Sequence, residues 1–513
     1  MAKLNVSVPS VDLNNYLIDA EVVKSIPERI ARKHKMIPLF KIRDALTVAI
    51  ANPSNPIALD EARAISGCSI QPLKGDESQI LKAIDQYYNV SNSIEEIIKD
   101  LQKEGMEFAQ EEKLDLIRLQ RIAEEPPVIK LVNLILAQAL KDNASDIHIE
   151  PQEDNVQVRI RVDGVLHNLA SFPRGIGLPV VPRIKVISGL DITERRKPQD
   201  GRFRVRIEDR EIDLRISTFP VAFGEKVVMR LLDHQTAFLS LEKMGFNPQV
   251  LNKFESLIAK PYGIILVTGP TGSGKTSTLY AVLNKLNSKG KNITTLEEPR
   301  EYLLEGVNQG EVNTEIDFTF ANGLRAILRQ DPDIIMVGEI RDLDTAQIAI
   351  RASLTGHLVL STLHTNDAAS AVTRLIDMGI EPFLIASSVI GVLAQRLVRV
   401  ICSNCKEEVA IDKCTPSDIL KSGVSGSKLE RVYHGKGCLF CKHTGYKGRI
   451  GIFELMPMDD NLRALVTENR PLVEIKNAAK QNGMKTLRQD GYNKVAEGIT
   501  TLEEVARVTF GEE

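Results

Sequence analysis

A glycine-rich segment between an apolar run and a helix-forming run constrains this chain more than any other feature of its sequence. Residues 269–276 read Gly-Pro-Thr-Gly-Ser-Gly-Lys-Thr and fit the pattern G-x-x-x-x-G-K-[ST]. The apolar residues Ile264 to Thr268 precede it and predict a buried strand, and Ser277 to Leu286 follow it and predict a helix. A strand, a glycine-rich loop and a helix in this order predict a phosphate-binding loop.

Each residue type in this loop has a chemical reason to be there. Glycines allow backbone N–H groups to surround phosphate oxygens, and the helix that follows adds partial positive charge. Lys275 is expected to reach the β- and γ-phosphates of ATP, and the Thr276 hydroxyl is expected to ligate Mg²⁺. The predicted ATP-binding residues are Gly269, Pro270, Thr271, Gly272, Ser273, Gly274, Lys275 and Thr276.

Short apolar strands alternate with helical stretches from Gly263 onward. The predicted strands are Ile264 to Thr268, Ile293 to Leu296, Ile334 to Val337 and Leu358 to Thr362. Such alternation is typical of α/β folds in which helices cover both faces of a parallel sheet. Ligands of these folds bind at the carboxyl ends of the strands.

Several acidic or basic side chains come directly after these strands, so they are expected at that same edge of the sheet. Glu339 follows one strand, and its carboxylate could polarise the attacking water or hold the metal's hydration shell. His364 closes the next strand and could sense the γ-phosphate, although a lone histidine is more often structural. Glu297 is expected to be catalytic, and the alternative for Glu297 and Glu298 is a surface or helix-capping carboxylate.

Four of the six cysteines form two Cys-x-x-Cys pairs. Cys402 pairs with Cys405 and Cys438 with Cys441. Two such pairs can complete a tetrahedral thiolate shell, which predicts a structural Zn²⁺ site with no position open for water. Redox pairing and chance spacing are the alternatives.

Length and composition bound the remaining possibilities. A chain of 513 residues is too long for a single hydrophobic core. Its net charge of -3 provides no global positive field, so no nucleic-acid partner is expected. No segment has the ~18 apolar residues of a membrane-spanning helix, and residues 1–10 lack a signal-peptide pattern. We therefore expect a cytoplasmic protein that reaches a membrane only through partners.

Six segments are predicted along the chain. They are an amino-terminal α+β partner-docking domain (1–90), a charged helical linker (91–126), a second, PAS-like α+β domain (127–240), a RecA-like ATPase core (241–398), a tetracysteine module (399–455) and a carboxy-terminal helical region (456–513). In the second domain, the residues Glu211 to Ser217 predict a strand. Ile212, Leu214 and Ile216 would lie on its packed face, and Asp213, Arg215 and Ser217 on the other.

These motifs together resemble the ATPases of type II secretion and type IV pilus assembly, the GspE/PilB family. The resemblance rests on four boxes in order, at residues 269–276, 295–299, 324–342 and 355–366. It extends to Ser145-Asp-Ile-His-Ile-Glu-Pro151, to residues 196–202 and to the tetracysteine module. Residues 37–39 and 51–53 are similar to the amino-terminal domain of the family.

The resemblance implies a homo-hexameric ATP hydrolase, peripheral at the inner membrane, whose turnover drives the extrusion of pilin or pseudopilin subunits. It implies two partners, an inner-membrane platform protein and a membrane-anchored cytoplasmic adaptor. It gives Glu339 the catalytic role and implies that Arg215 and Arg230 reach the phosphates, with surface salt bridges as the alternative. A pilus-retraction or DNA-translocating motor and a nucleotide-gated scaffold without turnover are the alternative functions.

Overall fold

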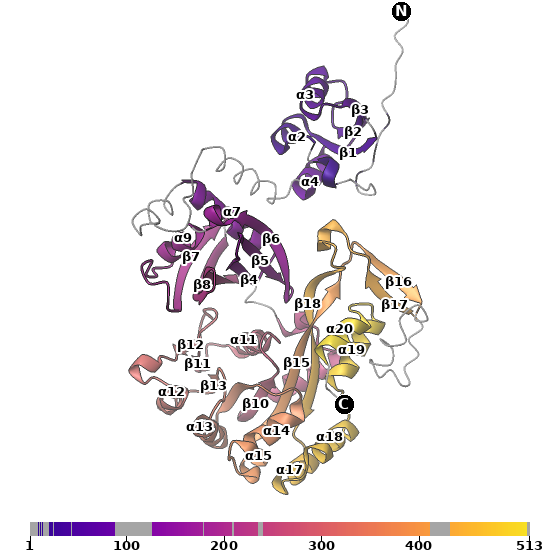
Figure 1. The fold of residues 1–513 in the computed structure, drawn as a ribbon. Helices are drawn as coiled ribbons and strands as arrows, with labels where there is room; N and C mark the ends of the chain where they lie inside the picture. The colour runs from indigo at the N-terminus through magenta and orange to yellow at the C-terminus, as the bar shows by residue number, and fades with distance from the viewer. Residues whose placement is uncertain are drawn as a thin grey trace, which may run out of the picture. The chain divides into compact units, whose positions relative to one another are not determined.

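The computed structural model in Figure 1 describes residues 20–87, 126–233, 240–410 and 431–509, without residues 24, 43, 178, 208 and 209, and also residues 9, 11 and 13. The chain divides into two compact units, residues 1–207 with 214–231, and residues 208–213 with 232–513. The predicted linker lies outside the described residues, apart from Pro126. Within the described ranges, no helix is both long enough and apolar enough to cross a membrane.

The amino-terminal part of the first unit is a small α+β domain. Its sheet has the order β1-β2-β3, with β1 and β2 antiparallel and β2 and β3 parallel. A parallel pair needs a crossover, which α3 supplies between its Asn55 N-cap and Gly67 at φ +65. The elements are α1 (Ala20–Val23), α2 (Glu28–His34), β1 (Met36–Ile42), β2 (Ala45–Ile50), α3 (Pro56–Ser66), β3 (Ser69–Lys74) and α4 (Glu77–Tyr87).

The rest of the first unit contains a six-stranded sheet with the order β6-β5-β4-β9-β8-β7. The predicted alternation in β8 is confirmed, because Ile212, Leu214 and Ile216 are buried whereas Ser217 is exposed. The elements are α7 (Pro126–Lys141), β4 (Asp146–Pro151), β5 (Asn155–Val162), β6 (Val165–Pro173), α8 (Arg174–Gly177), α9 (Val180–Ile187), β7 (Gln199–Ile207), β8 (Arg210–Val221) and β9 (Gly224–Asp233).

The second unit is built on a seven-stranded sheet with the order β12-β11-β13-β14-β10-β15-β18. All neighbouring strands are parallel except β15 and β18. The strands are β10 (Gly263–Thr268), β11 (Ile293–Glu297), β12 (Asn308–Glu311), β13 (Ile334–Val337), β14 (Leu358–Leu363), β15 (Val389–Ile401) and β18 (Tyr446–Pro457). The four strands predicted from the sequence are β10, β11, β13 and β14.

Helices cover both faces of this sheet because its buried strands are apolar on both sides. Ile264 and Leu266 pack into one hydrophobic cluster, and Ile265 and Val267 into the other. The first cluster includes α12 (Phe320–Ile327), α13 (Leu343–Leu354), α14 (Ala368–Asp377) and α15 (Pro382–Ser388), and the second includes η4 (Leu241–Met244), α10 (Pro248–Ile258) and α11 (Lys275–Leu286). The predicted α/β fold class with a parallel sheet is therefore confirmed.

A long antiparallel hairpin of β15 and β18 carries the cysteines. The two strands pair from Gly391 opposite Pro457 to Ile401 opposite Tyr446. Between them the chain forms β16 (Lys406–Ala410), β17 (Arg431–Gly435) and η7 (Leu439–Cys441). Most of β18 falls in the segment predicted as the tetracysteine module. The strand pairs with β15 and forms one edge of the seven-stranded sheet.

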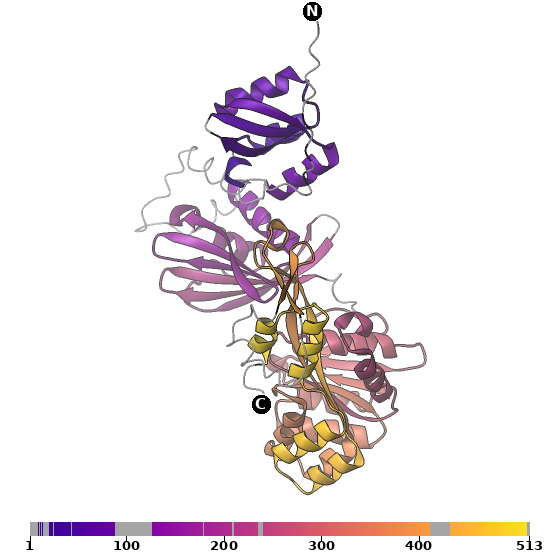
Figure 2. The same cartoon turned by 90° about the vertical axis from the view of Figure 1, so that its right-hand side faces the viewer.

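Four carboxy-terminal helices complete the second unit, namely α17 (Asp460–Thr467), α18 (Leu472–Gln481), α19 (Leu487–Ala496) and α20 (Leu502–Val508). Figure 2 shows α19 and α20 beside the β15–β18 hairpin. Glu504 of α20 is buried and accepts hydrogen bonds from Arg399 of β15 at 2.9 Å and from Arg507 at 2.6 Å. Burial raises the pKa of Glu504, but these bonds outweigh it and lower the pKa to about 2. The ionised carboxylate thus fastens α20 to the hairpin.

Candidate active site and cysteine cluster

The predicted phosphate loop joins β10 to α11, as the sequence indicates. Gly272 and Gly274 have φ angles of +79° and +89°, a region in which other residues are strained. A Cβ atom on Gly274 would lie 2.8 Å from Nε2 of Gln395, so close contact also requires glycine there. Glycine at these two positions therefore meets both the backbone conformation and the close packing of the loop.

Lys275 closes the loop on itself. Its ammonium group donates to the carbonyl oxygens of Gly269 at 2.8 Å and Pro270 at 3.1 Å. Burial lowers the pKa of Lys275, and the nearby Glu339 carboxylate acts in the opposite direction. Thr276 follows on the first turn of α11 and is exposed, so its hydroxyl is accessible to a metal ion.

The register of the parallel strands brings the predicted catalytic residues to this loop. Thr268 of β10 lies opposite Leu363 of β14, and Val337 of β13 lies opposite Ser361. The residues that follow these strands are therefore neighbours, and His364 Nε2 lies 3.2 Å from Glu339 Oε2. Glu339 and His364 thus meet at the carboxyl edge of the sheet.

Arg341 belongs to the same group of charges and was missed by the sequence reasoning. Its guanidinium forms an ion pair with Glu339 and donates to Glu298 Oε2 at 2.7 Å. The only sequence signal was its position two residues after Glu339, inside one of the boxes that carry the family resemblance. The sequence did not decide between a site residue and a surface carboxylate for Glu298. This contact joins Glu298 to Arg341, which also pairs with Glu339.

Glu297 has a different environment from Glu298. It is only 3% exposed and accepts hydrogen bonds from Tyr280 at 2.5 Å, Thr295 at 2.7 Å and Gln309 at 3.0 Å. Burial and the neighbouring Glu297 carboxylate raise the pKa of Tyr280, which keeps the phenol protonated as a donor. These contacts join β11 to α11, and a catalytic role for Glu297 stays a prediction.

The two predicted arginines belong to the six-stranded sheet of the first unit. Arg215 lies on β8 and Arg230 on β9, where Arg230 forms an ion pair with Asp146 at 3.0 Å. The positions of the two units relative to one another are not determined. Contact of these arginines with phosphate therefore stays a prediction.

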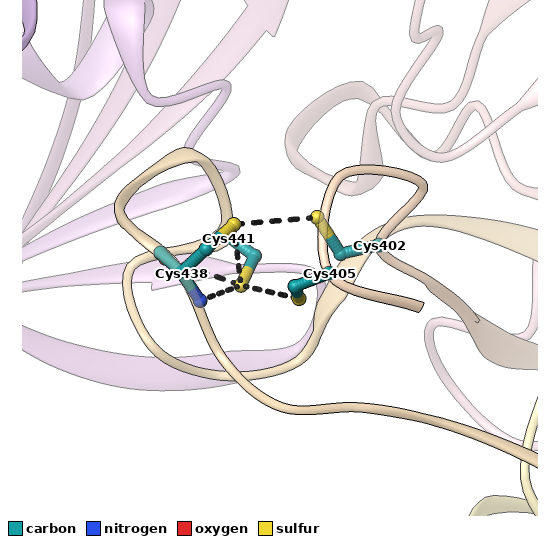
Figure 3. A group of neighbouring side chains, drawn as sticks. All are labelled: Cys402, Cys405, Cys438 and Cys441. Carbon is teal, nitrogen blue, oxygen red and sulfur yellow. Dashed lines mark hydrogen bonds between the residues drawn. The ribbon is translucent and has the colours of Figure 1, made fainter. Parts of the chain in front are cut away.

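The four predicted cysteines converge at the end of the β15–β18 hairpin, as Figure 3 shows. Their sulfur atoms all lie within 4.8 Å of one another. The Sγ–Sγ distance is 3.8 Å for Cys402 and Cys438, 3.8 Å for Cys405 and Cys441, and 3.7 Å for Cys438 and Cys441. Sulfur ligands at ~2.3 Å from a tetrahedral ion would be about 3.8 Å apart. The cluster therefore fits a four-thiolate metal site.

The backbone around the cluster favours the thiolate form of one cysteine, Cys441. The N–H groups of Cys438 and Gly445 donate to Cys441 Sγ at 3.1 and 3.2 Å. Burial raises the pKa of Cys441, but these donors outweigh it and lower the pKa to about 7. Burial raises the pKa of Cys405 to about 12.

Two protein families match this sequence. The Type II/IV secretion system protein family matches residues 121–507, and the MshEN domain matches residues 6–93. The first match spans most of the chain and includes the phosphate loop, Glu339, His364 and the four cysteines. The second covers the amino-terminal α+β domain.

Relatives and a solved structure agree with these matches. The type IV pilus assembly ATPase PilB of Myxococcus xanthus (strain DK1622) is 43% identical over 97% of this chain and 88% of its own. The type II secretion system protein E of Pectobacterium carotovorum subsp. carotovorum is 47% identical over 94% of this chain and 97% of its own. The pilus retraction motor PilT with bound ADP is 27% identical, with a TM-score of 0.52, over 74% of this chain and 96% of its own. The chain therefore belongs to the type II/IV secretion system protein family, as an ATPase of type II secretion or type IV pilus assembly.

Proposed function

We propose that this ATPase is a cytoplasmic motor, peripheral at the inner membrane, that works as a homo-hexamer. It couples ATP hydrolysis to the extrusion of pseudopilin or pilin subunits. The observation that carries this proposal is the meeting of the phosphate loop with Glu339 and His364 at one edge of the parallel sheet. Relatives named for type II secretion and for type IV pilus assembly are both similar over nearly the whole chain, so both machines remain in the proposal.

Each group at the sheet edge has one task in hydrolysis. Lys275 would exchange the carbonyl oxygens of the loop for the β- and γ-phosphates, and the Thr276 hydroxyl would hold Mg²⁺. When bound, Mg²⁺ would supply positive charge to stabilise the phosphoryl group in transfer. Glu339 polarises the attacking water. His364 forms a hydrogen bond with Glu339. Because Glu339 faces the γ-phosphate in this mechanism, loss of that phosphate changes the surroundings of His364.

Glu339→Gln tests the catalytic assignment. We expect it to lower kcat for ATP hydrolysis about a hundredfold or more with nearly unchanged ATP affinity, because the amide cannot polarise the water. Steady-state hydrolysis and binding of a fluorescent ATP analogue measure the two effects in the full chain. Glu315→Gln is the matched control, since Glu315 is exposed in η5 (Thr314–Ile316).

The same preparations test the hexamer, by mass determination with and without ATP. Six-fold assembly of the parent chain agrees with the proposed motor. Equal hydrolysis by the parent and the Glu339→Gln variant would contradict the catalytic assignment, and a monomer under all conditions would contradict the hexamer.

Arg215 and Arg230 complete the proposed mechanism by stabilising negative charge on the transferred phosphoryl group. We expect alanine at either position to lower kcat roughly a hundredfold while KM for ATP changes less than about threefold. Steady-state kinetics measure this split. Arg195→Ala is the control, because Arg195 is exposed in the same domain.

A mixing experiment tests whether the arginines contact the nucleotide bound to their own chain or the nucleotide bound to a neighbouring chain. If an arginine acts on a neighbour's nucleotide, mixing Arg230→Ala chains with Glu339→Gln chains restores part of the activity. Each restored site then combines Glu339 from one chain with Arg230 from the other. Equal loss of ATP affinity and kcat in the single variants would instead indicate contacts made before the transition state.

The tetracysteine cluster is proposed to hold structural Zn²⁺, since four thiolates leave no coordination position for water. Elemental analysis of the full chain is expected to find about one zinc per chain. Cys402→Ser combined with Cys438→Ser should abolish metal binding and expose the hairpin end to proteolysis, because metal binding and local folding are coupled. The control Cys68→Ser lies outside the cluster and should keep the metal. A metal-free chain that is fully folded and active would contradict the site.

The amino-terminal domain is proposed to dock onto a membrane-anchored cytoplasmic adaptor, while an inner-membrane platform protein receives the motion of the hexamer. Its separate match to the MshEN domain supports an independent module. Deletion of residues 1–90 is expected to release the chain from membranes in cells while hydrolysis by the purified protein stays within about threefold. Cell fractionation measures the first effect, and unchanged membrane association would contradict the docking role.

A further inference from the structure

Gln395 lies in β15 at the level of the phosphate loop. Its neighbour Ala394 pairs with Thr268, the last residue of β10, and Gln395 itself pairs with Phe453 of β18. Leu393, two residues earlier, packs into the cluster that contains α11. The alternation of a strand therefore directs Gln395 to the same face as Leu393, toward the start of α11.

The amide of Gln395 contacts the segment that begins α11. Its Oε1 accepts a hydrogen bond from Thr278 Oγ1 at 2.6 Å. Its Nε2 lies against Gly274, at 2.8 Å from where a Cβ atom would be. The backbone carbonyl oxygen of Gln395 lies 2.6 Å from the corresponding position on Gly269. One residue thus packs against both ends of the phosphate loop.

Hydrophobic packing alone does not explain an amide at this place. Gln395 is fully buried, and its Nε2 has no hydrogen-bond partner. An unpaired donor in the interior is unfavourable, and an apolar side chain of similar length would avoid that cost. The useful property of this side chain is its polar contact with the first turn of α11.

We propose that Gln395 is a positioning residue for ATP hydrolysis, which acts through the phosphate loop. By holding Gly274 and Thr278, it fixes the turn that presents Lys275 and Thr276 to the phosphates and Mg²⁺. The backbone N–H groups of the loop contact the phosphates in the ground state and the transition state alike. Loss of this support should therefore appear mainly in KM for ATP, with a smaller effect on kcat.

Gln395→Met tests the proposal, since methionine keeps the length of the side chain and removes the amide. We expect KM for ATP to rise about tenfold, less than the roughly hundredfold loss that a misplacement by about 1 Å can cause, while kcat changes less than about threefold. The melting temperature of the full chain without nucleotide should stay within about 2 °C, because the variant also removes the unpaired donor. A residue with only a structural role would lower the melting temperature and leave KM unchanged.

Thr278 provides the second arm of the experiment. Thr278→Val removes the other partner of the same hydrogen bond and should raise KM in the same direction, even if Gln395→Met did not fold. Thr278→Ser keeps the hydroxyl and should preserve KM. In the double variant, Gln395→Met with Thr278→Val, KM should rise no further than in Thr278→Val alone. That single change already removes the bond to Gln395, together with the contact of the hydroxyl with the Gly274 carbonyl oxygen at 3.3 Å.

Ser388→Ala is the matched control, because Ser388 immediately precedes β15, is buried, and donates to the carbonyl oxygen of Leu384 at 2.6 Å, far along the strand from the loop. It should leave both kinetic constants unchanged. An unchanged KM in Gln395→Met or in Thr278→Val, or losses that add in the double variant, would overturn the proposal.

Discussion

The register of the parallel strands is the constraint on which the rest of the site depends. Thr268, Val337 and Leu363 end three consecutive strands of the sheet, so whatever follows them must share one edge. The phosphate loop, Glu339 and His364 are neighbours for this reason, although 95 residues separate Thr268 from Leu363. A hydrogen bond from Thr268 to the carbonyl oxygen of Leu363 at 3.1 Å ties two of these ends together.

Charge at this edge is arranged in alternating signs. Glu339 lies between Arg341 and His364, and Arg341 also contacts Glu298. The Glu339 carboxylate also acts on Lys275. Glu339 and Glu298 are thereby both held by Arg341 before nucleotide binds. In the proposed mechanism, this preorganisation lowers the rearrangement needed for hydrolysis. At the cysteine cluster, backbone N–H donors likewise stabilise one charged group, the Cys441 thiolate.

Local patterns in the sequence predicted much of this arrangement. Buried parallel strands are continuous apolar runs, so β10, β11, β13 and β14 were recognisable, and Cys-x-x-Cys spacing depends only on local geometry. Contacts across long separations leave no such pattern. The sequence analysis did not identify β18 as a strand of the ATPase sheet, because the cysteine module separates it in the sequence from its partner β15. It did not identify Gln395, because the hydrogen-bond partner Thr278 lies 117 residues away. The surroundings of Glu297 likewise include distant residues, Tyr280 and Gln309. Its position at the end of a strand does not predict these contacts.

A structure of the full chain with Mg²⁺ and a non-hydrolysable ATP analogue tests the central claim most directly. The account predicts that residues 269–276 surround the phosphates, that Lys275 has exchanged the carbonyl oxygens of Gly269 and Pro270 for phosphate oxygens, and that Glu339 faces the γ-phosphate. A nucleotide whose γ-phosphate lies away from Glu339, with Lys275 still bound to the loop carbonyl oxygens, would contradict it.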